Sequence, residues 1–128
     1  MSGKIRPGPQ SPKSKVQSPK SRFQAALLRH VDRFALYLQA ARNASPHTVR
    51  SYTKDLSQFI EWLESEKLLR PGQNWDKVTY LMIRRYLGHL SAQEYNRRSM
   101  VRKLAALKAF FKWLERENIV THNPAAQV

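Results

Sequence analysis

Apolar residues recur at steps of three and four along the C-terminal part of the chain, a spacing that places them on one face of an α-helix. The pattern predicts a helix over residues 97–118, and Asn123-Pro124 blocks any further extension. The apolar stripe of this helix consists of Met100, Leu104, Leu107, Phe111 and Leu114.

The same periodicity predicts a first helix over residues 23–42 and a second over residues 45–67. Ser21 is a suitable N-cap for the first helix. Ser45 followed by Pro46 is a clear start signal for the second, because proline loses no hydrogen bond at the first helical position. The two stripes consist of Leu27, Val31, Phe34, Leu38 and Ala41, and of Val49, Tyr52, Leu56, Phe59, Ile60 and Leu63.

A third helix is predicted over residues 80–91, with Thr79 as its N-cap. Residues 68–77 contain Pro71-Gly72 and are expected to form a loop, from which Trp75 packs back onto the core. No segment alternates apolar and polar residues with a period of two, so we expect an all-α fold of four helices. The inward residues of the third helix are Ile83, Tyr86, Leu87 and Leu90.

The N-terminal part of the chain, residues 1–22, has a different composition. It is rich in Ser, Pro, Lys and Gln, and it contains the unit QSPKS twice. Because so few apolar residues cannot bury enough surface to fold, we expect a disordered basic tail followed by one helical domain over residues 23–128. The tail is either a solubilising extension or a segment with weak, sequence-independent affinity for DNA.

The formal net charge is +14, and the tail does not account for it: 17 basic residues face 9 acidic ones in the rest of the chain. A folded domain this basic points to nucleic acid or to an anionic membrane surface. The compact core stripes leave no free apolar face for a membrane. Without cysteines, a signal peptide or a membrane-length apolar run, the chain is expected to be cytoplasmic.

The basic residues concentrate in the N-terminal halves of two helices. On the second helix a polar stripe of His47, Arg50, Ser51, Lys54 and Gln58 lies opposite the core, and most acidic residues come later, so its N-terminus is the end that favours phosphate. The fourth helix begins at Arg97 and carries small alanines among its bases. That side of the helix holds Arg98, Arg102, Lys108, Lys112 and Arg116, with Ala105, Ala106 and Ala109.

Catalytic chemistry finds little support in the sequence. The four histidines are scattered, with no partner at the helical spacing of a metal site, and the chain has neither a glycine-rich phosphate loop nor a Ser, His and Asp grouping. We therefore expect no metal, no cofactor, no small-molecule substrate and no enzymatic activity of this chain by itself. Double-stranded DNA is the expected partner.

Two stretches carry a resemblance to a known family. SPHTVRSYTKDLSQFIEWL, residues 45–63, resembles the opening motif of the core-binding, or SAM-like, domain of Xer-type tyrosine recombinases and phage integrases. Residues 75–126 are similar to the rest of that domain. The resemblance implies a four-helix bundle that forms one half of a clamp around duplex DNA, with the second and fourth helices facing the major groove.

The resemblance also implies particular residues and partners. Lys108 would contact phosphate, and the first helix would touch a neighbouring protomer in a homo- or hetero-oligomer assembled on DNA. His47 and Arg97 join the candidates on the charge pattern alone. The family's contact positions correspond to Thr48, Arg50, Ser51, Lys54, Arg98, Ser99 and Arg102.

In this family a separate C-terminal domain supplies the tyrosine nucleophile and the other catalytic residues. The chain ends at Val128, about where the interdomain linker would begin. We therefore expect the catalytic domain to be absent from this chain and the full-length protein to be a site-specific tyrosine recombinase acting in DNA integration or recombination. Two alternatives stay open, a helical oligomerisation module and a nucleoid-type, sequence-independent DNA binder.

Overall fold

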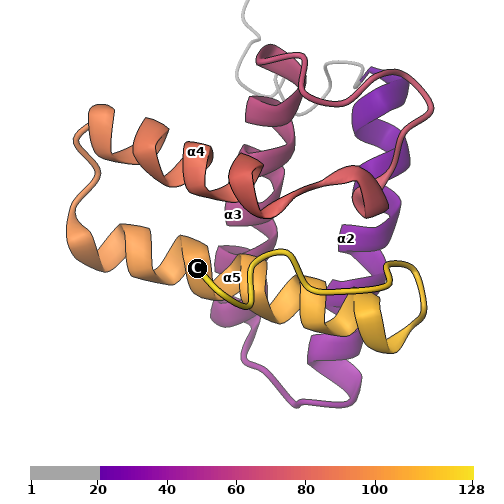
Figure 1. The fold of residues 1–128 in the computed structure, drawn as a ribbon. Coiled ribbons are helices and arrows are strands. Elements are labelled where there is room, and N and C mark those ends of the chain that lie inside the picture. The colour runs from indigo at the N-terminus through magenta and orange to yellow at the C-terminus, as the bar shows by residue number, and fades with distance from the viewer. Residues whose placement is uncertain (1–20) are drawn as a thin grey trace, which may run out of the picture.

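The computed structural model describes residues 21–128, and the expectations for residues 1–20 lie outside this range. The described part contains four α-helices and no strand, which confirms the predicted all-α fold (Figure 1). A short 3₁₀ helix stands between the second and third of them. The elements are α2 (Arg22–Ala40), α3 (Pro46–Ser65), η2 (Trp75–Lys77), α4 (Tyr80–Ala92) and α5 (Arg97–Arg116).

Each α-helix begins at a polar residue whose side chain accepts a hydrogen bond from the backbone three residues on, the geometry of an N-cap. The predicted caps Ser21, Ser45 and Thr79 are confirmed, with acceptor distances of 3.0, 3.1 and 3.2 Å. Asn96 caps α5 in the same way at 2.8 Å, and the sequence reading did not identify it. Helix α2 begins at Arg22, one residue earlier than predicted.

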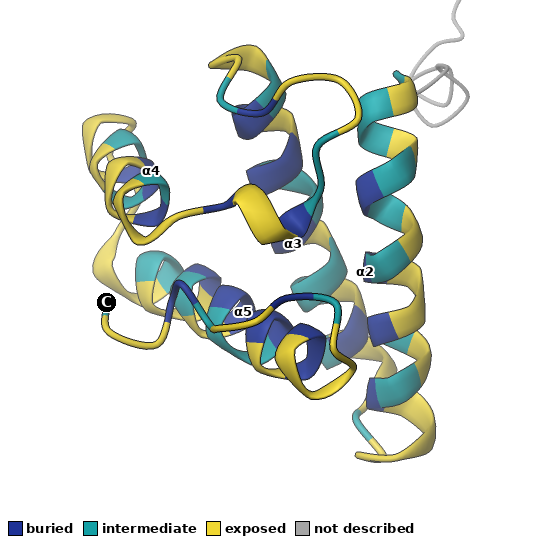
Figure 2. Cartoon of the chain, turned by 45° about the vertical axis from the view of Figure 1, so that its right-hand side comes forward, coloured by how far each residue is buried: buried dark blue, intermediate teal, exposed yellow. Residues whose placement is uncertain are grey.

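The helices enclose one core. Helices α2 and α3 lie side by side and run in opposite directions, α5 crosses in front of α3, and α4 lies beside α5 (Figure 1). The N-terminal end of α3 and the C-terminal end of α2 therefore lie at the same end of the molecule. The buried residues lie on the sides of the helices that face one another (Figure 2).

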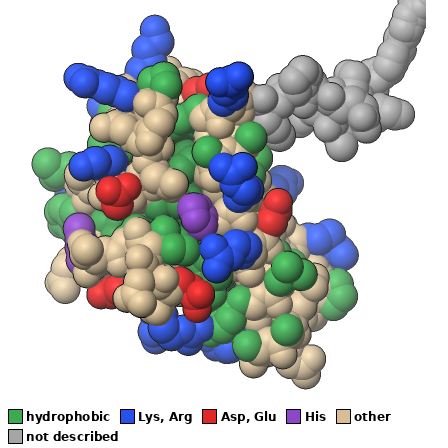
Figure 3. Space-filling view, turned by 90° about the vertical axis from the view of Figure 1, so that its right-hand side faces the viewer, with side chains coloured by type: hydrophobic (Ala, Val, Ile, Leu, Met, Phe, Trp, Pro, Cys, Tyr) green, Lys and Arg blue, Asp and Glu red, His purple; other side chains and the backbone are tan. Residues whose placement is uncertain are grey.

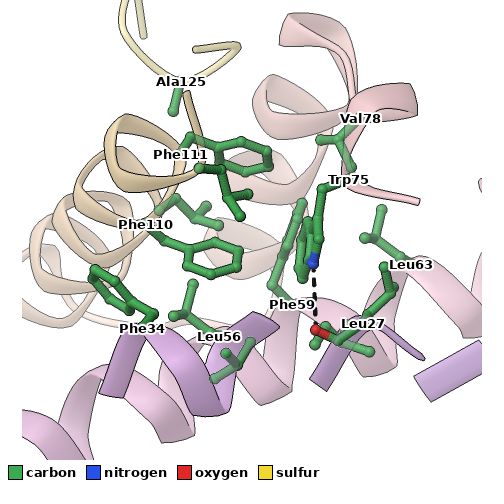
Figure 4. Packing of buried hydrophobic residues seen from close by; sticks show 14 of the residues in the cluster. Leu27, Phe34, Leu56, Phe59, Leu63, Trp75, Val78, Phe110, Phe111 and Ala125 are labelled. Atoms are coloured by element: carbon green, nitrogen blue, oxygen red, sulfur yellow. Dashed lines mark hydrogen bonds between the residues drawn. The ribbon is translucent and has the colours of Figure 1, made fainter. Parts of the chain in front are cut away.

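Trp75 lies at the centre of this core. Its side chain is fully buried, and its indole Nε1–H donates to the carbonyl oxygen of Leu27 at 3.3 Å (Figure 4). The rings of Phe110 and Phe111 meet the indole edge to face at 4.8 and 5.6 Å, and Phe59 stacks on it at 6.4 Å. The expectation that Trp75 closes the core is confirmed, and its ring is not free to stack on a base.

The buried side of α5 is wider than its predicted stripe. Phe110 and Trp113 are buried together with Leu107, Phe111 and Leu114. Ala106 is also fully buried, so its assignment to the basic side of the helix was wrong. Ala105 is exposed and Ala109 is half-buried, so these two alanines do lie among the basic residues. The extra width accommodates α2 and η2 on the two flanks of α5.

Trp75→Ala should destabilise the fold by about 3–5 kcal/mol, because a large cavity would open among aromatic rings that cannot close it. Trp75→Phe keeps most of the packing and loses the bond to Leu27, so its cost should be clearly smaller. Unfolding by urea, followed by circular dichroism, measures both. Equal stability of the alanine variant and the wild type would contradict the central place of Trp75.

The stability should also depend on pH through His30. Burial, and after it the charges of Arg33 and Arg29, lower the pKa of His30 below its ordinary value of 6.5. The unfolded chain therefore takes up this proton more readily, and the free energy of unfolding should fall as the pH decreases below about 6.5. His30→Gln should remove this part of the pH dependence. His122→Gln, at an exposed position, is the control and should retain it.

Candidate nucleic-acid interface

A buried carboxylate joins α3 to α5. Asp55 on α3 is only 3% exposed, and both its oxygens accept hydrogen bonds from cations of α5. The Arg102 Nε–H donates to Oδ2 at 2.9 Å, and the Arg102 Nη2–H donates to Oδ1 at 3.0 Å. The Lys103 ammonium donates to Oδ1 at 2.9 Å. One acidic side chain thus holds two consecutive basic residues of the neighbouring helix.

Lys103 is almost as deeply buried as Asp55, at 4% exposure. Its ammonium also donates to Gln58 Oε1 at 2.6 Å and lies 5.1 Å from the centre of the Tyr95 ring. The Gln58 amide in turn donates to the Tyr95 hydroxyl at 2.7 Å. A buried ammonium is tolerated only when such partners replace its water shell. The network therefore fixes the position of α5 against α3.

Arg102 lies at the outer edge of this network and is exposed. Its hydrogen bonds to Asp55, with a smaller contribution from the charge of Asp55, raise the pKa of the guanidinium. Within the described residues, the bonds to Asp55 use only Nε and Nη2. These two bonds hold the planar guanidinium in a fixed orientation and leave the Nη1 hydrogens without a partner among the described residues.

On α3, the candidate residues precede Asp55. Ser51 is half-buried and lies one helical turn before Asp55 on the same side of α3. Lys54 directly precedes Asp55 and is exposed. Thr48 lies a further turn away, and its hydroxyl accepts from the Ser45 hydroxyl at 3.0 Å within the N-cap. The exposed His47 and Arg50 belong to the same first turns of the helix.

On α5, most candidate residues lie within the turns next to the Asp55 contact, and Lys108 lies apart from it. Arg98 and Ser99 lie one turn before Arg102, and Arg97 is the first residue of the helix. Arg97 and Arg98 are exposed and form no salt bridge within the described part of the chain. Lys108 lies about 9 Å further along the helix axis, beyond the contact, and is half-buried.

Sequence reasoning missed the residues that make this junction. It gave Asp55 no role, and it did not connect Lys103, Gln58 and Tyr95. A signal was present, since Asp55 borders the apolar stripe of α3 and Lys103 borders the stripe of α5. A single acid on one core face and a single base on another is the pattern of a buried pair.

Other parts of the surface are less uniform in charge. On the side of α2, Lys and Arg side chains are interspersed with acidic and hydrophobic ones (Figure 3). Over residues 21–128, no helix is long and apolar enough to cross a membrane. Across the same residues, no three His, Cys, Asp or Glu side chains gather into a group that could hold a metal ion.

Basic residues clustered on the N-terminal halves of two helices, which a buried ion pair joins, form the kind of positive patch that nucleic-acid-binding domains carry. The family comparison matches residues 31–118 to the phage integrase N-terminal SAM-like domain. The chain belongs to this family, as the resemblance in the sequence predicted. A search of solved structures gave no significant match.

Curated relatives point in the same direction. The chain is 42% identical over 99 residues to the tyrosine recombinase XerC of Oceanobacillus iheyensis, an alignment that covers 77% of this chain and 31% of that protein. It is 36% identical over 96 residues to XerC of Listeria innocua, with 75% and 31% covered. The chain thus spans about a third of the length of the curated relatives it matches.

Asp55→Ala should destabilise the domain by about 3–5 kcal/mol, because it leaves the Lys103 ammonium buried without a counter-charge. The double variant Asp55→Leu/Lys103→Met should cost less than Asp55→Ala alone, because neither charge then stays buried. Urea unfolding of Asp55→Leu, Lys103→Met and their double variant measures this coupling. Strictly additive losses would show that the two side chains do not act as a pair.

Proposed function

We propose that this chain is the core-binding domain of a Xer-like, site-specific tyrosine recombinase, and that it binds duplex DNA through the N-terminal halves of α3 and α5. The observation that carries the proposal is the bond between Asp55 and Arg102, because it joins the N-terminal halves of the two helices that carry the basic candidate residues. Membership of the SAM-like integrase family supports it.

Arg102 is the residue we assign to base recognition. An arginine reads guanine through two parallel hydrogen bonds, which requires that its plane be held still. Asp55 holds that plane from behind and leaves the outward N–H groups available. The half-buried Ser51 and Ser99, one turn before Asp55 and Arg102, lie close enough to the junction to contact neighbouring base edges or phosphates.

The remaining candidates are assigned to the DNA backbone. Arg50, Lys54, Arg97 and Arg98 are exposed, and such side chains contact phosphate far more often than bases. The first turns of α3 and α5 carry no acidic residue, so the N-terminal dipoles of both helices favour a phosphate nearby. His47 and Thr48 lie within the first turn of α3, and Lys108 would reach the backbone beyond the junction.

Strand exchange itself is assigned to a catalytic domain in a longer protein. The curated relatives are named as tyrosine recombinases, and the chain corresponds to about a third of their length. We assign no catalytic residue to residues 1–128. The partners proposed for the whole protein are duplex DNA and further recombinase protomers assembled on it.

Binding to duplex DNA should weaken steeply with salt, with a log–log slope near −5 if about five or six phosphates are neutralised. For a duplex selected from a random-sequence library, Arg102→Ala should cost about 1–3 kcal/mol of binding free energy and relax the preference at one base position. Fluorescence anisotropy measures both quantities.

The Arg102→Ala variant should keep its fold, because Asp55 retains its bond to Lys103. Arg70→Ala, at an exposed position in the connection after α3, is the control and should bind like the wild type. An affinity that does not change between low and high salt would contradict the proposed function. A uniform loss over all sequences would instead make Arg102 a phosphate contact.

A further inference from the structure

A groove with a basic rim lies away from the Asp55 junction, between the C-terminal ends of α2 and α5. Its apolar floor includes Phe34 and Trp113, and none of the residues that line it is acidic. Three cations stand at its edge, and no salt bridge within residues 21–128 neutralises them. The groove is lined by Phe34, Tyr37, Leu38, Arg42, Ala109, Lys112, Trp113 and Arg116.

Tyr37 is the polar centre of the groove. The Arg116 guanidinium lies 4.6 Å from the centre of the Tyr37 ring, and the guanidinium groups of Arg42 and then Arg116 lower the pKa of its hydroxyl by hydrogen bonding. Arg42, in the connection after α2, and Arg116, the last residue of α5, thus converge on one phenol. The acids nearest in sequence are Glu115 and Glu117, which flank Arg116 and do not line the groove. Glu117 Oε1 lies 3.8 Å from Arg33 Nη2, and the Arg33 guanidinium stacks on Trp113.

The groove continues the basic side of α5. Starting from Arg98, steps of four, three, four, three and four residues lead to Arg102, Ala105, Ala109, Lys112 and Arg116. Residues at this spacing form one line along a helix. The two alanines in the middle of the line would allow a polyanion to approach the helix closely, and cations stand at both ends.

The two ends of the basic line on α5 lie further apart than the major groove of DNA is wide. Arg102 and Arg116 are fourteen residues apart in sequence, which is about 21 Å along the helix axis. The major groove of B-DNA is about 12 Å wide. If the N-terminal half of α5 enters the groove crosswise, its C-terminal half must extend over the sugar-phosphate backbone on one side.

From this placement we infer that the groove is a second DNA contact, in which Arg42, Lys112 and Arg116 bind phosphates of the backbone that borders the major groove. The inference rests on the proposed function and extends it to α2, whose C-terminal end carries none of the candidate DNA-binding residues. These contacts read no bases. They add affinity that is independent of sequence, while the Asp55 junction provides the choice of sequence.

The test uses two variants with the same loss of charge. One carries Arg42→Gln, Lys112→Gln and Arg116→Gln. The other carries Lys67→Gln, Arg70→Gln and Lys77→Gln, three exposed positions in the connection between α3 and α4. Because both lower the net charge by three, any difference between them reports position rather than total charge. Urea unfolding verifies that both are folded.

The groove variant should bind every duplex about tenfold or more weakly near 0.1 M salt, keep its ranking of sequences, and show a salt slope closer to zero by about 2–3. The control variant should keep nearly the wild-type slope. If the groove variant keeps that slope while Arg98→Gln/Arg102→Gln reduces it, the groove assignment is wrong and the proposed function stands. If the wild-type chain itself binds no duplex, both fail.

A polyglutamate peptide, added as a competitor, distinguishes a protein partner from DNA. Displacement of duplex DNA from the wild type, but much weaker displacement from the groove variant, would agree with an anion site used by DNA. A peptide that binds the wild type through the groove without reducing its affinity for DNA would overturn the inference, because the groove would then lie outside the DNA footprint.

Discussion

The arrangement of α3 and α5 depends on the buried carboxylate of Asp55, which must stay paired with the Lys103 ammonium. Asp55 and Lys103 lie almost entirely out of water, and a buried charge is tolerated only with a partner at hydrogen-bonding distance. Helix α5 can therefore neither slide along α3 nor rotate against it without breaking the pair. Since Arg102 shares the same carboxylate, the constraint that stabilises the core also orients an exposed guanidinium. Under the proposed function, core packing and DNA recognition are thus coupled at a single residue.

Helix α5 combines several roles in one sequence of twenty residues. Its inner side packs Phe110 and Phe111 around Trp75, and its edge supplies the ion pair. We propose that its outer side meets DNA in two ways, with sequence read near Arg102 and phosphates bound near Arg116. This division follows from helix geometry if α5 enters the major groove crosswise, because a helix of about 30 Å is longer than that groove is wide.

Much of the fold was predictable from the sequence, because local rules determine it. Apolar periodicity located the four helices, and the capping preferences of Ser45 and Thr79 located two of their starts. The junction was not predictable in the same way. Whether Asp55 faces water or Lys103 depends on how α3 crosses α5, which the pattern of either helix alone does not contain. Ala106 was misassigned for the same reason, since its burial depends on the position of a neighbouring element.

The most direct test of the account is a nuclear magnetic resonance titration of the ¹⁵N-labelled chain with a duplex selected from a random library. The account requires that the backbone amides of Thr48, Ser51 and Lys54 on α3 and those of Arg98 and Arg102 on α5 shift together, with one common dissociation constant. Shifts confined to one of the two helices, or shifts of the two groups with clearly different constants, would contradict it.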